Sequence, residues 1–386
     1  VVNDIFEYVS IFQPTSADDH ITSNSPADAD WQFYRPMAGN DTIIGSDYLD
    51  GLHYGERGEV GVTVNFATGR ALDQFGGVDE FSKMDGVIGS DAADEFIGSA
   101  AIDTIYYAGR AGNDTIRGTD STDIADYSLD EVYGAVLGVI VNLSKGTAID
   151  GFGDTDTLLK VDDVNGTKFA DQLIGDAGDN VLDGMGGDDS ILGGEGNDRL
   201  RGGAGNDTLR GGFGVDSYYG GAGDDLIDAS IANADGSWSA WVVPGEGSNT
   251  IVGNQSLWYS GNGISISYSQ DLSGTGGVVI VASADGSGTV TSNNAGVVND
   301  TFTFVNNFEG SDGADHITAA NNPDVVWQGY RPMAGNDTVI GSNNWDELTY
   351  HEGDTGRGVT VNFDLGAATD QYGDTDTFSN IDAVRG

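Results

Sequence analysis

The sequence predicts an all-β protein, a parallel β-roll or β-solenoid, from three observations. Glycine and aspartate return in the same order every nine residues between residues 175 and 228. A much longer segment repeats after 296 residues. The chain also combines 61 glycines with 6 Trp, 15 Tyr and 15 Phe and with frequent Val, Ile and Thr, which is typical of ordered β structure. Such periods indicate stacked neighbours around a quasi-one-dimensional core.

The shorter period is built from nonapeptides. Six consecutive units run from residue 175 to residue 228: GDAGDNVLD, GMGGDDSIL, GGEGNDRLR, GGAGNDTLR, GGFGVDSYY and GGAGDDLID. A weaker unit, GTKFADQLI at 166–174, precedes them. One apolar residue in nine cannot form a helix face, whereas a short strand with its middle side chain inward fits the pattern. The glycines at positions one, two and four are expected to supply the positive φ angles of the turn.

The longer period relates residues 1–54 to residues 297–350, with 29 identities in 54 positions. Within it lie degenerate modules, each with a glycine turn such as AGNDTII at 38–44, a strand of alternating apolar residues, and a segment with apolar residues spaced by three. We read the chain as four such modules, with the nonapeptides inserted in the second. The expected boundaries are 1–26 for the end of a preceding module, 27–104 and 105–165 for degenerate modules, 166–228 for the nonapeptides, 229–322 for a further module and 323–386 for the next copy.

Stacked aspartates require an explanation, because two nonapeptides per coil would place equivalent carboxylates about 4.8 Å apart along the axis. Two charges at that distance repel by roughly 3 kcal/mol at an effective dielectric constant of about 20. One inward Leu or Ile contributes only about 1.5–3 kcal/mol, so a cation is expected between the loops. Carboxylate and carbonyl oxygens favour Ca²⁺ over Zn²⁺, and Mg²⁺ is disfavoured because it keeps its waters. The position-six aspartates are Asp171, Asp189, Asp198, Asp207, Asp216 and Asp225, with Asn180 replacing one.

The run from residue 193 to residue 228 resembles the repeats-in-toxin (RTX) motif GGxGxDxUx, a calcium-binding β-roll repeat. The resemblance implies that each aspartate and the loop carbonyls hold Ca²⁺ between successive coils. It also implies secretion by a bacterial type I pathway and folding when Ca²⁺ is met outside the cell. The glycines expected to contribute carbonyls are Gly184, Gly186, Gly193, Gly202, Gly211 and Gly220.

Isolated AGND turns elsewhere in the chain keep the ligand pattern. They contain Asp41, Asp114 and Asp337. None has a strict partner nine or eighteen residues away, so the sequence leaves open whether each of these turns binds an ion.

The charge of the chain bounds its partners. It carries 62 acidic and 15 basic residues, a formal charge of −47, and no cysteine. This balance argues against a nucleic-acid partner, because neutralising phosphates requires Lys and Arg. It also argues against a basic membrane-binding segment. No apolar run approaches the ~20 residues of a membrane span. The chain starts without Met and inside a repeat, so we expect a piece of a longer secreted, extracellular or cell-surface protein.

Two loops combine aromatic residues with arginine, WQFYRPMAGN at 31–40 and WQGYRPMAGN at 327–336. An exposed aromatic near Arg can bind a sugar or a protein partner. The alternative, which we favour, is that the Trp rings fill the roll. The candidate ligand-binding residues are Trp31, Tyr34, Arg35, Trp327, Tyr330 and Arg331.

Three functions follow as hypotheses. The first is a non-catalytic, calcium-rigidified spacer, adhesin stalk or surface-layer component, with neighbouring copies of the repeat as partners. The second is an accessory β-roll of a secreted polysaccharide-modifying enzyme or protease. The third is a module that binds a surface glycan or a cell-surface partner. We expect no catalytic residues, because neither a zinc-protease motif nor a Gly-x-Ser-x-Gly elbow occurs.

Overall fold

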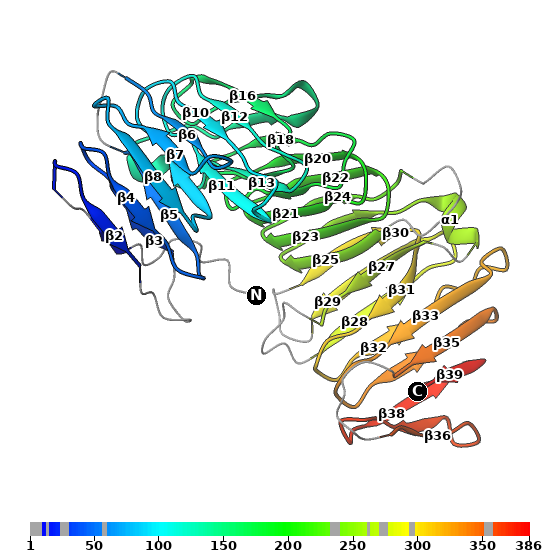
Figure 1. Cartoon of the computed structure of the whole chain (residues 1–386). Helices are drawn as coiled ribbons and strands as arrows, with labels where there is room; N and C mark the ends of the chain where they lie inside the picture. Colours follow the sequence, from blue (N-terminus) through cyan, green and yellow to red (C-terminus); the bar gives the residue numbers. More distant parts are fainter. Residues whose placement is uncertain are drawn as a thin grey trace. The chain divides into compact units, whose positions relative to one another are not determined.

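A computed structural model describes residues 10–12, 15–23, 31–55, 60–231, 240–260, 263–269, 277–292, 298–350 and 358–386. The described residues are almost entirely β-strands (Figure 1), which confirms the predicted fold class. The chain divides into two compact units. The first comprises residues 1–176 and 181–185, and the second comprises residues 177–180 and 186–386.

Each unit has two sheets, and the chain passes from one to the other between strands except where three consecutive strands stay in one sheet. In the first unit, one sheet, called the first sheet, is parallel throughout. Its strands follow in space the order β1 (Ser10–Phe12), β3 (Gln32–Tyr34), β5 (Asp50–His53), β9 (Gly86–Ile88), β11 (Thr104–Ala108), β13 (Thr122–Asp126), β17 (Asp163–Asn165) and β19 (Val181–Asp183).

The opposite sheet of the first unit, called the second sheet, mixes parallel and antiparallel pairs. Its strands are β2 (His20–Thr22), β4 (Thr42–Ile44), β8 (Val78–Ser82), β7 (Arg70–Leu72), β6 (Thr63–Asn65), β10 (Glu95–Ile97), β12 (Thr115–Arg117), β16 (Thr155–Leu159), β15 (Thr147–Ile149), β14 (Ile140–Asn142) and β18 (Gln172–Ile174). Two short 3-10 helices, η1 (Asp130–Tyr133) and η2 (Leu143–Lys145), accompany them.

The second unit repeats this arrangement. Its first sheet contains β21 (Arg199–Ala204), β23 (Asp216–Ala222), β25 (Ala240–Glu246), β27 (Ile264–Ser267), β31 (Val305–Glu309), β33 (Trp327–Arg331), β35 (Trp345–Thr349) and β39 (Ala383–Arg385). Its second sheet contains β20 (Ser190–Glu195), β22 (Thr208–Phe213), β24 (Leu226–Asp228), β26 (Thr250–Val252), β30 (Asn299–Thr303), β29 (Ser287–Ser292), β28 (Val278–Ala282), β32 (His316–Thr318), β34 (Thr338–Ile340), β38 (Thr375–Ser379), β37 (Ala367–Thr369) and β36 (Thr360–Asn362). The single α-helix of the described residues is α1 (Gln255–Ser260).

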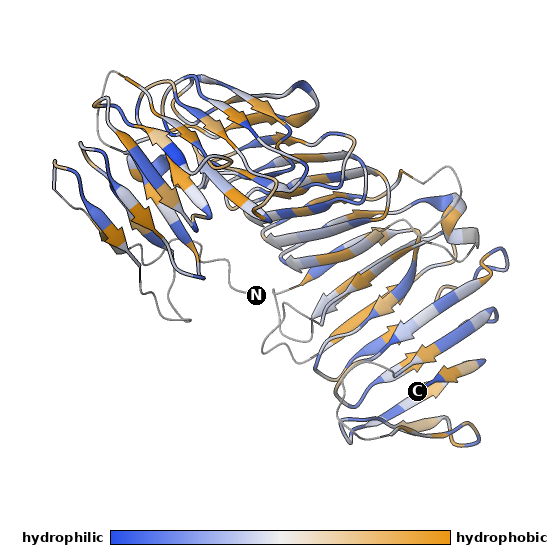
Figure 2. Ribbon diagram, viewed as in Figure 1, coloured by the Kyte–Doolittle hydropathy of each residue, from blue (hydrophilic) through white to orange (hydrophobic). Residues whose placement is uncertain are grey.

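The nonapeptides form coils of two units each, as the spacing predicts. Ser190 of β20 pairs with Thr208 of β22, and Arg199 of β21 pairs with Ser217 of β23, so each register step is 18 residues. The position-eight side chains point inward and are at most 1% exposed; they are Leu182, Ile191, Leu200, Leu209, Tyr218 and Ile227. Figure 2 shows the resulting alternation of hydrophobic and hydrophilic residues along the strands. Each buried aliphatic side chain contributes about 1.5–3 kcal/mol to this core.

The degenerate modules depart from a purely parallel roll. In the first module, β6, β7 and β8 form an antiparallel meander inside the second sheet, while β4 and β8 remain parallel. The same triplet recurs as β14 to β16, β28 to β30 and β36 to β38. Antiparallel neighbours need only a short turn, so each module adds a hairpin without adding a full coil. Gly69, with φ of +64°, supplies the left-handed residue of the β6–β7 turn.

Among the described residues, no helix is long and apolar enough to cross a membrane.

Candidate metal sites

The turn aspartates of the nonapeptides form buried ladders. The Asp189 N–H donates to Oδ1 of Asp207 at 2.8 Å, and the Asp207 N–H donates to Oδ1 of Asp225 at 2.9 Å. On the other side of the coils, Asn180 donates to Asp198 at 2.9 Å and Asp198 donates to Asp216 at 3.0 Å. One oxygen of each accepting side chain is therefore committed to the preceding coil.

The second carboxylate oxygen of each turn faces a position-one glycine. A Cβ atom at Gly202 would lie 2.6 Å from the Gly220 carbonyl oxygen and closer still to Asp207 Oδ2. Gly193 has the same surroundings, formed by the Gly211 carbonyl and Asp198 Oδ2. The expectation that position-one glycines supply positive φ angles is wrong, since the positive angles lie at positions two and four, as at Gly203 and Gly205. Position one requires glycine because oxygen atoms occupy the space of a side chain.

These second oxygens have the character expected of cation ligands. Asp207 Oδ2 and Asp225 Oδ2 are buried and receive no hydrogen bond. Burial raises the pKa of Asp207 to about 6. Burial, together with repulsion from the Asp207 carboxylate, raises the pKa of Asp225 to about 7. A buried polar group without a partner costs about 1–3 kcal/mol, and a hard cation beside these carboxylate and carbonyl oxygens would remove that cost.

Two of the predicted ligands differ from the others. Both oxygens of Asp171 accept hydrogen bonds, from the Thr167 N–H at 2.6 Å, the Thr167 hydroxyl at 2.9 Å and the Val139 N–H at 2.7 Å. Unlike Asp207 and Asp225, Asp171 thus has no oxygen without a hydrogen bond, and its calcium binding stays a prediction. At Asp216, the hydroxyl of the buried Tyr218 stabilises the carboxylate and also accepts a hydrogen bond from the Gly211 N–H. Tyr218 thus competes with an ion at Asp216.

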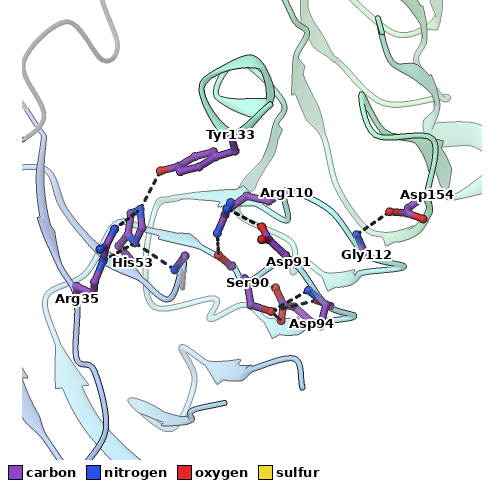
Figure 3. A network of polar contacts seen from close by, with 12 residues as sticks. Arg35, His53, Ser90, Asp91, Asp94, Arg110, Gly112, Tyr133 and Asp154 are labelled. Carbon is purple, nitrogen blue, oxygen red and sulfur yellow. Dashed lines mark hydrogen bonds and ion pairs between the residues drawn. The ribbon is translucent and has the colours of Figure 1, made fainter. Parts of the chain in front are cut away.

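The residue at position two distinguishes Asp171 from the aspartates of the six regular nonapeptides. Where Ser or Thr replaces the second glycine, its N–H and hydroxyl bind the turn carboxylate, as at Ser90 with Asp94 (Figure 3) and at Ser311 with Asp315. Where glycine stands at position two, no side chain is present to do so. The distinction was readable in the sequence, because Thr167 stands at position two of the weak unit.

The isolated turns do have partners, which the sequence analysis missed. Asp41, Asp114 and Asp337 are each 1% exposed. Their N–H groups donate to Oδ1 of an aspartate 38 to 42 residues later, namely Asp79, Asp156 and Asp376. The signal that could have found these partners is a recurring D-x-(F/Y)-G-x-x-D segment at 73–79, 150–156 and 370–376.

Main-chain atoms are needed to complete any of these sites. Across the part of the chain that the structure describes, no three Asp, Glu or His side chains lie close enough together to hold a metal ion by themselves. Ca²⁺ takes six to eight oxygen ligands, including carbonyls and water. The residues that fit such a site in the nonapeptides are Asp189, Asp198, Asp207 and Asp225 with the carbonyls of Gly211 and Gly220. A bound Ca²⁺ would supply positive charge between turns whose carboxylates otherwise repel each other.

The predicted aromatic platform is only partly available. Trp31 and Tyr34 are each 4% exposed, and Trp31 stacks on Phe33 with 5.3 Å between ring centroids. The ligand-binding hypothesis is therefore wrong for Trp31 and Tyr34, because buried rings cannot receive a ligand. Arg35 lies beside the buried His53, with Nε 3.3 Å from Nδ1 (Figure 3).

The second copy of this segment is more open. Trp327 is half-buried, while Tyr330 is 2% exposed and donates its hydroxyl to Asp346 at 2.9 Å. Arg331 pairs with Glu309 at 2.7 Å.

Comparison with known families agrees with this geometry. The model of the RTX calcium-binding nonapeptide repeat matches four segments, residues 88–125, 165–200, 192–227 and 333–355. They include the nonapeptide array and the turns of Asp114 and Asp337. No curated protein matches the chain at a significant level. The chain therefore contains RTX calcium-binding nonapeptide repeats.

Proposed function

We propose that this chain is a non-catalytic structural segment of a larger secreted bacterial protein, and that extracellular Ca²⁺ folds and rigidifies it. The observation that carries the proposal is the pair of buried oxygens, Asp207 Oδ2 and Asp225 Oδ2, which receive no hydrogen bond within a stacked ladder. The 296-residue repeat supports a role as spacer, adhesin stalk or surface-layer component, since repetition extends a rod. Ion binding that occurs only in the folded state stabilises that state by mass action.

The test is far-UV circular dichroism during Ca²⁺ titration after EDTA treatment, with Mg²⁺ as the control ion. A cooperative gain of β signal with Ca²⁺ alone is the expected result. Full β structure in EDTA would refute calcium-dependent folding.

A matched pair of glycine variants locates the effect. Gly202→Ala places a methyl group against Asp207 Oδ2 and the Gly220 carbonyl, whereas a Cβ at Gly358 meets nothing within 4 Å. We expect Gly202→Ala to raise the Ca²⁺ concentration needed for folding and Gly358→Ala to leave it unchanged. Equal midpoints for the two variants would place the calcium dependence outside this turn.

An accessory β-roll of a secreted polysaccharide-modifying enzyme or protease is the alternative for the parent protein. Finding a catalytic domain in the full open reading frame would favour this alternative. Finding further 296-residue copies instead would favour the structural segment.

A second candidate function, glycan binding, is favoured by a groove on the first sheet of the second unit. Its volume is about 470 Å³, within the range typical of small-molecule sites. Its lining includes Trp241, Trp327, Ser265, Asn307 and the Glu309–Arg331 ion pair. Aromatic faces beside hydroxyl, amide and charged groups suit a sugar, which has both apolar C–H faces and hydroxyls.

The first copy of the repeat indicates how to close this groove. Gly329 of the second copy corresponds to Phe33 of the first copy, where the Phe33 ring packs on Trp31. We expect Gly329→Phe and Trp327→Ala to abolish binding on a glycan array, while Val326→Ala, an exposed position outside the groove lining, leaves it intact. Absence of any bound glycan with the calcium-loaded protein would reject this candidate.

A further inference from the structure

The three D-x-(F/Y)-G-x-x-D segments, called the acidic loops below, occupy equivalent places in the fold. They lie at residues 73–79, 150–156 and 370–376 and join the last two strands of an antiparallel triplet: β7 to β8, β15 to β16 and β37 to β38. The final aspartate of each acidic loop sits in a strand that runs parallel to the strand after an AGND turn. Each acidic loop therefore faces an isolated turn aspartate.

The hydrogen bonds of the second module account for most of the oxygens there. Asp150 Oδ1 accepts the N–H groups of Phe152 and Asp154 at 3.0 and 2.8 Å. Asp156 uses both oxygens, accepting from the Asp114 N–H at 2.9 Å and from the hydroxyl of Tyr127 at 3.1 Å.

Buried carboxylate oxygens remain without a hydrogen bond in the second module. Asp114 Oδ1 accepts the Asp94 N–H at 2.7 Å, but Asp114 Oδ2 and Asp150 Oδ2 receive no hydrogen bond. Asp114 and Asp150 are each 1% exposed. The nearby Asp130 Oδ1 is also buried and receives none. The turn and the acidic loop thus each present one unpartnered carboxylate oxygen in the interior.

The corresponding oxygens are left over in the other copies. In the first module they are Asp41 Oδ2 and Asp73 Oδ2. In the fourth they are Asp337 Oδ2 and Asp370 Oδ2, and Asp376 Oδ2 is left over as well. In the first module a main-chain oxygen lies near Asp73, because the Gly39 carbonyl and Asp73 Oδ2 both lie close to the Cβ position of Gly77. All three copies thus leave the turn aspartate and the first aspartate of the loop with one unpartnered oxygen each.

The charged groups that act most strongly on these carboxylates are other carboxylates. Burial, together with repulsion from the carboxylates of Asp94 and Asp156, raises the pKa of Asp114 to about 9. At Asp337, burial with repulsion from Asp315 and Asp376 raises the pKa in the same direction. A bound cation or a proton would offset this repulsion.

The third module shows the same turn without the charge. Asn249 occupies the position of Asp114, its N–H donates to Asp300 Oδ1 at 2.8 Å, and Tyr268 donates to Asp300 Oδ2 at 2.7 Å. A neutral amide at this position provides the acceptor oxygen for the preceding turn, at 2.8 Å from the Asp225 N–H, without adding a negative charge. The backbone therefore does not require aspartate here.

We propose that each acidic loop and its turn aspartate form a second kind of cation site, distinct from the nonapeptide sites, for a hard divalent cation such as Ca²⁺. The turn aspartate and the first aspartate of the loop provide the ligands: Asp41 with Asp73, Asp114 with Asp150, and Asp337 with Asp370. Main-chain carbonyls and water complete the shell. The proposal builds on the calcium-dependent function proposed above but concerns other residues.

The test uses terbium, which replaces Ca²⁺ and emits when a nearby excited tyrosine transfers energy to it. Tyr54, Tyr127 and Tyr350 adjoin the three sites, and Tyr268 adjoins the equivalent position with asparagine. We expect each of Tyr54→Phe, Tyr127→Phe and Tyr350→Phe to lose part of the tyrosine-excited emission. Tyr268→Phe, the matched control, should keep it. Equal emission from the control and from the triple Phe variant would overturn the proposal.

A second variant guards against loss of folding. Asp150→Asn keeps the oxygen that accepts from Phe152 and Asp154 and imitates the neutral side chain of the third module. We expect it to bind one Ca²⁺ fewer than the wild type in equilibrium dialysis. An unchanged count, with the Ca²⁺-induced gain of β signal intact, would refute the acidic-loop sites and leave the nonapeptide function standing. If the wild type itself showed no gain of β signal with Ca²⁺, the proposed function would be refuted instead.

Discussion

The second and third modules have the same turn and differ at one buried side chain. Asp114 and Asn249 each accept a hydrogen bond from the preceding turn, and each donates its N–H to the aspartate of the next strand. The oxygen acceptor is thus the structural requirement of the turn, and asparagine meets it. The hydrogen bonds of this turn do not require the charge of Asp114, whereas the proposed cation would.

Removing calcium should separate the two modules most strongly. The Thr157 N–H donates to the Asp114 carbonyl and the Thr301 N–H donates to the Asn249 carbonyl, both at 2.8 Å. In EDTA we expect amide exchange to speed up more at Thr157 than at Thr301, because the turn of the second module keeps the buried carboxylate of Asp114, whereas Asn249 carries no charge. Hydrogen exchange resolved by residue measures this. Equal loss of protection would mean that Asp114 and Asn249 respond alike to calcium.

Exchanging the two side chains should reverse the difference. Asn249→Asp buries an additional carboxylate beside Asp300, so we expect the free energy of unfolding in EDTA to fall by about 1–3 kcal/mol. Asp114→Asn should raise it by a similar amount and should weaken calcium binding. Denaturant unfolding in EDTA and in Ca²⁺ measures both changes. If Asp114→Asn lowered the free energy of unfolding in EDTA, the inferred difference between Asp114 and Asn249 would be wrong.

In the absence of calcium, acidification should reduce the difference in stability between the second and third modules. The folded-state pKa of Asp114 is raised to about 9 and that of Asp300 to about 6, in both cases mainly by burial, from a usual value of 3.8. A raised pKa means that the folded state binds the proton more tightly, so the contribution to stability is present below pH 3.8 and is lost as the pH rises through the folded pKa. The stabilisation from the proton on Asp114 is therefore lost progressively up to about pH 9, and that from the proton on Asp300 up to about pH 6.

In EDTA, β structure should therefore increase as the pH falls from 9 toward 4. Between pH 9 and pH 6 the rise should be smaller in Asp114→Asn than in the wild type, because Asp337 and Asp225, whose pKa values are also raised, still contribute. Circular dichroism of the wild type and of Asp114→Asn across this range measures the effect. A β signal that falls on acidification over the same range would contradict the assigned sign.

Exposed side chains should contribute least to the difference in stability between the second and third modules. Arg117 follows the second turn and pairs with Glu95 at 3.1 Å, with side chains 48% and 43% exposed, whereas Val252 holds the same place in the third module. Arg117→Val should change the unfolding free energy by less than about 0.5 kcal/mol, because exposed ion pairs contribute little. A larger change in thermal or denaturant unfolding would shift the explanation from the buried turn to the surface.

The sequence predicted the coil but not the connections between distant turns. Nine-residue spacing sufficed to place Ile191, Leu200 and Leu209 in the core and to stack Asp207 on Asp225. It did not predict that Asp114 meets Asp156, because an inserted hairpin separates them by 42 residues and hides the period.

Two other features required atomic geometry. Asp171 matches the nonapeptide pattern at position six. Thr167 at position two sets this unit apart in the sequence, but the hydrogen bonds from Thr167 to the carboxylate are seen only in the structure. Trp31 and Trp327 share nearly identical surroundings in sequence, yet Phe33 closes the first site where Gly329 leaves the second open. In each case a single neighbouring side chain, Thr167 or Phe33, sets the local structure, so the repeated sequence pattern alone could not predict it.

The buried ladders have a direction. In each of them the N–H of an earlier turn binds the carboxylate of a later one, as in Asp19 to Asp41 to Asp79 and in Asp315 to Asp337 to Asp376. A coil is consequently completed by its successor, and a stack of coils has a donor end and an acceptor end that differ chemically. A tandem copy that continued such a stack could join it only head to tail, and the two ends of the stack are therefore not interchangeable.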